Sequence, residues 1–227
     1  MKKTVLIIVI VFVAVLAGSV WFQVARDPDF TGFGDEEQVN APVVNYLSGD
    51  GDQANAGEAP PFNWKNHPVF VVGDSLTEGA RKEIEKAVGD ATVDGKASRT
   101  MGQGLRILED WADGGILPDD AIIVVCLAHN ITGSTISDAE QIVGMMKSGQ
   151  SLIMMTGHGN SNMDPINEYI RSLPRAYAYI AVADWDLTIA QSPSLLSSDG
   201  VHIAKRQGNE LYAELILRAL EVASPKP

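Results

Sequence analysis

A short apolar run at residues 69–72 stands directly before Gly73-Asp74-Ser75 and constrains the fold more than any other stretch. Three of its four residues are β-branched valines, which is typical of a strand buried on both faces. The segment after the serine, residues 78–88, has apolar residues at helical spacing and is predicted to be a helix. Ser75 therefore stands where a buried strand turns into a helix, with the amide groups of the helix start beside its hydroxyl.

Two interpretations of this serine follow from its position. An Asp-Ser pair is common at the start of a helix, so Asp74 and Ser75 can be read as a structural cap. Alternatively, Ser75 is a nucleophile, because helix-start amides stabilise the negative charge that develops when a hydroxyl attacks a carbonyl. Two later polar stretches, at residues 128–130 and 199–202, favour the second interpretation.

Strands and helices alternate along the rest of the chain. Further strands are predicted at 91–94, 121–127, 151–156 and 179–183, and further helices at 101–111, 162–173 and 203–222. Ser137 and Glu140 have the spacing of a capping box, which predicts one more helix start at Ser137. This alternation is typical of a three-layer, doubly wound α/β fold, in which the ligand site lies at the carboxyl ends of parallel strands.

The N-terminal segment has the pattern of a membrane anchor. Residues 4–22 are almost wholly apolar and follow Lys2 and Lys3. A run of about 19 residues is long enough to cross a hydrocarbon core of ~30 Å, so residues 1–26 are predicted to be a transmembrane helix. The lysines before the run place the rest of the chain outside the cytoplasm. The alternative is a cleaved signal peptide, with small residues at 17–19 near the cut, and a secreted protein.

The next segment, residues 27–67, is predicted to be a flexible tether because it is rich in acidic residues, glycine and proline. Its Gly49-Asp50-Gly51-Asp52 motif lacks the loop pattern and closing glutamate of a calcium site. Residues 68–227 form the predicted folded domain.

Composition narrows the class of protein. The formal net charge of −12 argues against a nucleic-acid binder, which needs a basic face. The single cysteine, Cys126, lies in an apolar run, which predicts a buried and inert thiol. No spacing of cysteines and histidines indicates a metal site, so neither a metal nor a cofactor is predicted.

Three polar stretches fall at strand ends or helix starts: Gly73-Asp74-Ser75, Ala128-His129-Asn130 and Asp199-Gly200-Val201-His202. A serine, an asparagine and an aspartate–histidine pair are sufficient for acyl transfer. They supply a nucleophile, an oxyanion donor, a general base and a group that orients the base. The sequence therefore favours acyl chemistry at Ser75.

In these three stretches, taken in this order, the sequence resembles the SGNH/GDSL hydrolases over residues 69–222. It is similar, more narrowly, to the extracytoplasmic SGNH domain of acyltransferase-3-type peptidoglycan O-acetyltransferases, on residues 93–99, 183–185 and 199–203. The resemblance implies a flavodoxin-like SGNH hydrolase fold. Ser98 departs from it, because the family usually has glycine there, and Ala128-His129-Asn130 stands where the family usually reads Gly-Thr-Asn.

The resemblance implies a role for each matching residue. Ser75 attacks an ester carbonyl, His202 acts as the general base, and Asp199 orients the imidazole of His202. The oxyanion is bound by the backbone N–H groups of Ser75 and Ser98 and by the side-chain amide of Asn130.

Several polar residues near these stretches keep more than one interpretation. Arg99 either binds a carboxylate or a sugar of the substrate or forms a structural ion pair. His129 is a bulky, titratable group beside the site and a candidate substrate-binding residue. His158 is interpreted as a loop histidine, Asp74 as a hydrogen-bond partner of nearby backbone, and Asp184-Trp185-Asp186 as a packing segment.

Together these features predict a serine esterase or O-acyltransferase that acts through an acyl-serine on acyl groups, in particular acetyl groups, of a cell-envelope glycan. The expected substrate is an acylated glycan or a small ester, and the expected partners are the membrane and a membrane acyltransferase, with no nucleic acid. The alternative is a catalytically inactive SGNH-fold module that binds glycan or a membrane acyltransferase. The presence of Ser75, Asp199 and His202 together favours the enzyme.

Overall fold

The computed structural model describes residues 62–227. The predicted anchor, residues 1–26, and the predicted tether up to residue 61 lie outside the described residues. Across 62–227, no helix is both long enough and apolar enough to cross a membrane. Ordered packing begins before residue 68, because Phe62 and Trp64 contact the core and a short 3-10 helix covers Trp64–Asn66.

Five parallel strands form one sheet in the order β2-β1-β3-β4-β5. This is the order of flavodoxin-like folds, as predicted. The carboxyl ends of the strands meet at one edge of the sheet, which is where a site is expected in such folds. The strands are β1 (Val69–Gly73), β2 (Ala91–Gly95), β3 (Ile122–Cys126), β4 (Ser151–Met155) and β5 (Ile180–Ala183).

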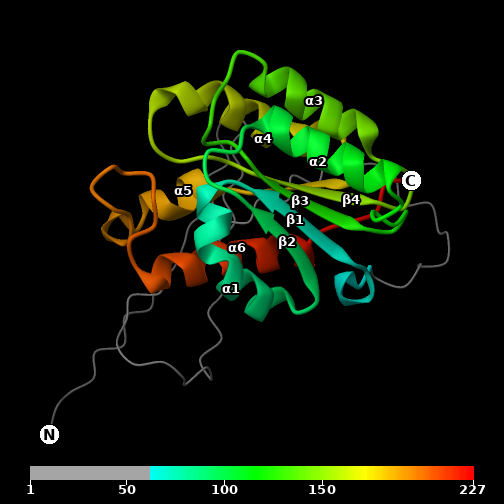
Figure 1. The fold of residues 1–227 in the computed structure, drawn as a ribbon, viewed down its shortest axis with the longest axis horizontal. Coiled ribbons are helices and arrows are strands. Elements are labelled where there is room, and N and C mark those ends of the chain that lie inside the picture. Colours follow the sequence, from blue (N-terminus) through cyan, green and yellow to red (C-terminus); the bar gives the residue numbers. More distant parts are fainter. Residues whose placement is uncertain (1–61) are drawn as a thin grey trace, which may run out of the picture. The chain divides into compact units, whose positions relative to one another are not determined.

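Helices cover both faces of the sheet (Figure 1). Helices α1 and α6 pack on one face, while α2, α3 and α4 pack on the other, and the short α5 joins the core of α1 and α6. The three-layer prediction is confirmed. The helices are α1 (Ser75–Val88), α2 (Met101–Asp113), α3 (Thr135–Met145), α4 (Asp164–Ala176), α5 (Trp185–Ala190) and α6 (Arg206–Glu221), with 3-10 turns at Ser161–Met163 and Pro193–Leu195.

Strand β1 is buried on both faces, as its valine-rich sequence predicts. Val69 and Val71 belong to the core under α1 and α6, whereas Phe70 and Val72 belong to the core under α2, α3 and α4. Successive side chains of a strand point to opposite faces, so a central strand needs apolar residues at every position.

Helix boundaries are where the sequence prediction needs correction. Helix α3 begins at Thr135, and Ser137 does not cap it, because the Ser137 hydroxyl donates to the carbonyl of Ser134. A capping box does occur at the start of α2, between Thr100 and Gln103. Helix α6 begins at Arg206 and not at residue 203, because Ile203 pairs with Leu196 in a β-bridge.

Two glycines let helix α1 lie close against the ends of β1 and β2. Gly73 and Gly95 are register partners in these neighbouring strands. A Cβ on Gly73 would lie 1.9 Å from the Thr77 side chain, and a Cβ on Gly95 would lie 2.4 Å from the backbone nitrogen of Glu78. The first turn of α1, which includes Ser75, is therefore packed directly onto the carboxyl edge of the sheet.

Candidate active site

Ser75 is the first residue of α1, immediately after the end of β1. Its neighbour Asp74 is the N-cap, and Asp74 Oδ1 accepts a hydrogen bond from the Leu76 backbone N–H at 3.0 Å. The cap is therefore Asp74, which leaves the Ser75 hydroxyl available for another partner.

That partner is a histidine from the other end of the domain. Ser75 Oγ lies 3.1 Å from His202 Nε2, and His202 Nδ1 lies 2.7 Å from Asp199 Oδ2. The carboxylate can only accept, so Nδ1 carries the proton and Nε2 is free to accept from the serine hydroxyl. The structure thus brings the predicted nucleophile, base and orienting carboxylate into one hydrogen-bonded line.

Asp199 is held by donors of its own loop. Its Oδ1 accepts from the Ser197 hydroxyl at 2.6 Å and from the backbone N–H groups of Val201 and His202 at 2.9 and 3.0 Å. The hydrogen bond from Ser197 is the main cause that lowers the pKa of Asp199 well below its usual range, so the carboxylate stays ionised. Ser197 was not predicted; its signal in the sequence was a serine two residues before the aspartate.

The opposite side of the site is a turn in the loop between β2 and α2. Ser98 has φ +60° and is the one residue other than glycine with a positive φ among those described. The resemblance expects glycine at this position, and the left-handed backbone explains that preference. The backbone N–H of Arg99 donates to the Lys96 carbonyl at 3.2 Å and closes the turn. The backbone N–H of Ala97 donates to Glu78 Oε2 at 2.9 Å, which connects the turn to α1.

Arg99 points inward and does not face a substrate. Its side chain is 6% exposed, and it donates to the carbonyl of Gly73 at 3.0 Å, to Asp94 Oδ1 at 2.8 Å and to the Asp94 carbonyl. Arg99 therefore forms a structural ion pair with Asp94, and its guanidinium does not bind a carboxylate or a sugar of the substrate. Its backbone carbonyl accepts from Asn130 Nδ2 at 3.1 Å, which joins the two predicted oxyanion segments.

His129 uses both of its ring nitrogens within the protein, so its predicted substrate-binding role is limited to the face of the ring. Its Nδ1 lies 3.0 Å from Asp74 Oδ2, and its Nε2 accepts the backbone N–H of His158 at 3.2 Å. A backbone N–H can only donate, so the imidazole is neutral with its proton on Nδ1. Both ring nitrogens are thus committed, and His129 links the N-cap of α1 to the loop between β4 and α4.

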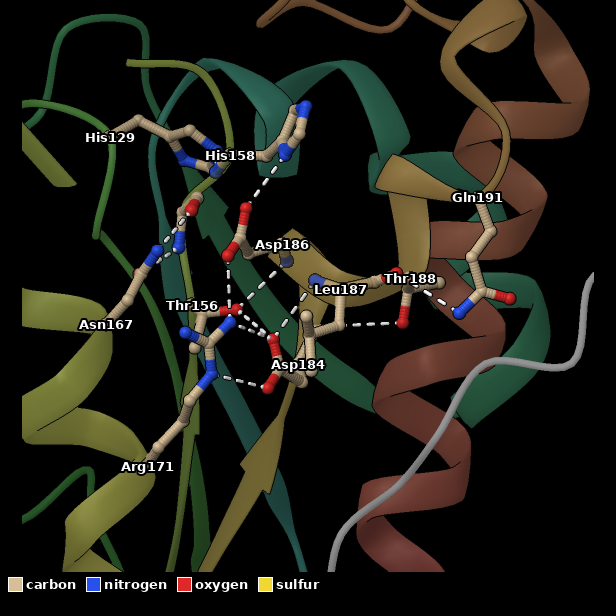
Figure 2. A network of polar contacts seen from close by, with 11 residues as sticks. His129, Thr156, His158, Asn167, Arg171, Asp184, Asp186, Leu187, Thr188 and Gln191 are labelled. Atoms are coloured by element: carbon tan, nitrogen blue, oxygen red, sulfur yellow. Dashed lines mark hydrogen bonds and ion pairs between the residues drawn. The ribbon is translucent and has the colours of Figure 1, made fainter. Parts of the chain in front are cut away.

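A polar network continues behind this histidine (Figure 2). His158 Nδ1 lies 2.8 Å from Asp186 Oδ1, and Arg171 bridges Asp186 and Asp184 with hydrogen bonds of 2.7–2.8 Å. Burial opposes ionisation of Asp186, but the hydrogen bonds from Arg171 and His158 outweigh it and lower the pKa of this carboxyl. Asn167 holds the Gly157 backbone at both its N–H and its carbonyl.

The remaining predictions near the site concern inert groups. Cys126 is buried, as predicted, and burial raises the pKa of its thiol to about 12. Asp184 is buried with hydrogen bonds to Thr156 and Arg171, and Trp185 packs edge-on against Tyr212, so this segment packs as expected. Over the described part of the chain, no group of three or more histidines, cysteines or acids is placed to hold a metal ion.

The fold is similar to those of several solved proteins, which agrees with the resemblance seen in the sequence. A lipolytic protein of the G-D-S-L family from Veillonella parvula matches with a TM-score of 0.54 and 15% identity, over 67% of this chain and 97% of that one. A carbohydrate esterase of family 3 from Talaromyces cellulolyticus matches with a TM-score of 0.51 and 16% identity, over 67% and 95%.

A more specific likeness is to the C-terminal catalytic domain of peptidoglycan O-acetyltransferase A from Streptococcus pneumoniae. The TM-score is 0.65 with 24% identity, over 71% of this chain and 96% of that domain. In sequence, the "Putative peptidoglycan O-acetyltransferase YrhL" of Bacillus subtilis is 24% identical over 153 residues. The match spans 67% of this chain but 24% of that protein's length. No protein-family model matches the chain. These likenesses agree with the predicted class of serine ester hydrolase or acyltransferase.

Proposed function

We propose that this protein is an SGNH-type serine esterase or O-acyltransferase that transfers acetyl groups of a cell-envelope glycan through an acyl-serine. One observation carries the proposal: Ser75 Oγ, the imidazole of His202 and the carboxylate of Asp199 form a continuous line at 3.1 and 2.7 Å. The nucleophile begins a helix at the carboxyl edge of the sheet, where such chemistry is favoured.

The proposed reaction has two halves with the same acid–base residue. Ser75 Oγ attacks the ester carbonyl while His202 Nε2 takes its proton, and the tetrahedral intermediate collapses as His202 returns that proton to the leaving alkoxide. Asp199 keeps the imidazole in the required tautomer and stabilises it when it is charged. Water or a sugar hydroxyl then attacks the acyl-serine, giving hydrolysis or transfer.

The oxyanion is assigned to the backbone N–H groups of Ser75 and Ser98 and to the Asn130 amide. An amide nitrogen carries two protons, and Asn130 uses one of them on the Arg99 carbonyl. The second proton is left for the oxyanion, and the first keeps the amide in a fixed orientation. Arg99 and Glu78 act as positioning residues, because they hold the turn that carries Ser98.

The location and partners are proposed from sequence and likeness. Residues 1–26 are proposed to be a transmembrane anchor, 27–67 an acidic tether and 68–227 the extracytoplasmic catalytic domain, which a membrane acyltransferase would supply with acyl groups. The support is the apolar run after Lys2 and Lys3 and the likeness to a peptidoglycan O-acetyltransferase domain. External protease should remove the domain from cells stripped of any outer barrier; a domain protected until the membrane is opened would contradict this location.

The activity is tested with the full-length protein and an acetyl ester, with and without a glycan acceptor. Free acetate measures hydrolysis and acetylated product measures transfer, and a fluorophosphonate probe should label Ser75. Ser75→Ala is the control and should abolish turnover and labelling. Glycan binding with no turnover and no labelling of the unaltered protein would instead support the inactive module.

A further inference from the structure

A polar pocket of about 400 Å³ opens beside the proposed oxyanion groups. Three loops at the carboxyl edge of the sheet line it, those following β2, β3 and β4. Its walls carry the hydroxyls of Ser98 and Thr100, the amides of Asn130, Asn160 and Asn162, the ring of His129 and the side chain of Ile131. The pocket has the volume expected for a small-molecule site.

The pocket walls hold hydrogen-bonding groups that the protein does not use. Within residues 62–227, no hydrogen bond is made by the side chains of Ser98 or Asn162. Among the described residues, Asn160 uses only Oδ1, which accepts the Asn162 backbone N–H at 3.0 Å, so its NH2 group has no partner there. Thr100 Oγ1 accepts the Gln103 backbone N–H, so its proton remains available to donate.

The chemistry of the lining selects the kind of ligand. In the described part of the chain, no lysine, arginine, aspartate or glutamate lines this pocket, and both nitrogens of His129 have partners elsewhere in the protein. Hydroxyls and amides that both donate and accept are suited to a neutral ligand that does the same. Ile131 is 37% exposed and adds one apolar surface, which suits the C–H face of a sugar ring.

The loop between β4 and α4 is held in place before any ligand binds. Asn167 fixes the backbone of Gly157, and His129 and Asp186 fix the backbone and the side chain of His158 (Figure 2). A Cβ on Gly159 would lie 2.8 Å from the Val201 side chain, so the loop runs against the segment that carries His202. Asn160 is thus presented in the same pocket as the proposed oxyanion residues Ser98 and Asn130 by a preorganised loop.

We propose that Thr100, Asn160 and Asn162 form a subsite that binds a neutral sugar ring bearing hydroxyl and acylamino groups, next to the ring whose ester reacts. The subsite extends the proposed function. The reaction at the neighbouring ring rests on that function, whereas binding of the sugar to the subsite does not. Since no charge takes part, binding does not weaken as salt rises.

The test is binding of an N-acetylglucosamine oligomer to full-length protein carrying Ser75→Ala, measured by calorimetry at low and high salt. Asn162→Ala should raise the Kd about fivefold to tenfold, the effect of losing one or two hydrogen bonds. Asn160→Asp keeps the oxygen that accepts the Asn162 N–H but removes the free NH2, and should raise the Kd at least as much. Gln141→Ala is the matched control, an exposed amide outside the pocket, and should leave the Kd unchanged.

The outcomes separate the subsite from the reaction. The subsite is overturned if both asparagine variants bind the oligomer as the parent does, or if binding is lost at high salt. Hydrolysis of a small acetyl ester by the protein with Ser75 intact reports the proposed function alone. Sugar binding that depends on Asn160 and Asn162 without ester hydrolysis would therefore support the subsite and reject the enzyme.

Discussion

Two histidine–carboxylate pairs adjoin Ser75, one through the hydrogen bond to His202 and the other through the neighbouring residue Asp74, and they differ most in their contact with solvent. In the pair His202–Asp199 the side chains are 54% and 50% exposed, whereas in His129–Asp74 they are 5% and 0% exposed. The geometry is alike, with Nδ1 to carboxylate distances of 2.7 and 3.0 Å. The difference lies at Nε2, which faces a serine hydroxyl in one pair and a backbone N–H in the other.

A histidine–carboxylate pair is therefore not by itself sufficient for catalysis. A general base needs a lone pair directed at a proton that can be transferred. The lone pair on Nε2 of His202 is directed at the hydroxyl of Ser75. Nε2 of His129 faces an amide proton that cannot be transferred, so that pair can only connect segments.

The largest expected effect is on the exposed pair. His202→Ala should lower kcat/KM on a small acetyl ester by about 10⁴-fold or more, because the proton acceptor is removed. Asp199→Ala should cost somewhat less, and the double variant little more than His202→Ala, because the residues act as a unit. The measurement is kcat/KM for the three variants. Losses that simply multiply, or near-full activity in His202→Ala, would reject the triad.

The buried pair should respond in stability. His129→Ala leaves the Asp74 carboxylate buried without its partner and should lower the free energy of unfolding by about 3 kcal/mol. Asp199→Ala is the comparison: the groups that lose this carboxylate lie on an exposed loop and can be solvated, so it should lower the free energy of unfolding less than His129→Ala does. Urea denaturation followed by circular dichroism measures both. Equal stability of the two variants would show that burial does not distinguish the pairs.

A smaller gain is expected where the backbone is left-handed. Ser98→Gly removes the steric cost of φ +60° and should raise the free energy of unfolding by about 0.5–1 kcal/mol. The backbone N–H assigned to the oxyanion stays, so ester hydrolysis should be preserved. Ser137→Gly, in the exposed part of α3, should instead destabilise by a similar amount. A destabilised Ser98→Gly would contradict the strain.

The smallest effect concerns pH. The pKa of Asp199 is lowered, so its carboxylate stays ionised at pH values below its usual range. The stability that this adds is complete above the usual pKa of an aspartate and is lost as the pH falls through the lowered pKa. The acid limb of kcat/KM should therefore follow an imidazole and not this carboxylate. Ser197→Ala moves the pKa of Asp199 towards its usual value, still below imidazole titration, and should leave the limb in place. A limb that shifts in this variant would assign it to Asp199.

The sequence was sufficient to predict the sheet, the layers and the three segments that meet at the site. Buried parallel strands need unbroken apolar runs, and residues 69–72 and 121–127 have them. Polar residues that directly follow such runs lie at the same edge of the sheet, which is why Ser75 and Asn130 could be grouped from the sequence. The Asp199–His202 segment follows no strand directly, and the family resemblance grouped it with them.

The directions of individual side chains were not predictable in the same way. Arg99 and His129 are close to the site in sequence, but whether they face the pocket or the interior depends on partners such as Asp94 and Asp74. Helix α5 was missed because six residues show too little periodicity, and the capping box at Thr100 was missed although its residues were visible.

The pairing of Leu196 with Ile203 has a consequence for inactivation. It closes a loop that contains both Asp199 and His202, so a movement of this exposed loop would displace the base and the orienting carboxylate together. They lie 127 positions from Ser75 in the chain, and the direct contact between His202 and Ser75 is one exposed hydrogen bond. Opening of this loop would separate base from nucleophile while the sheet and its helices stay folded. Heating should therefore abolish the proposed ester hydrolysis reversibly at a temperature below that of global unfolding.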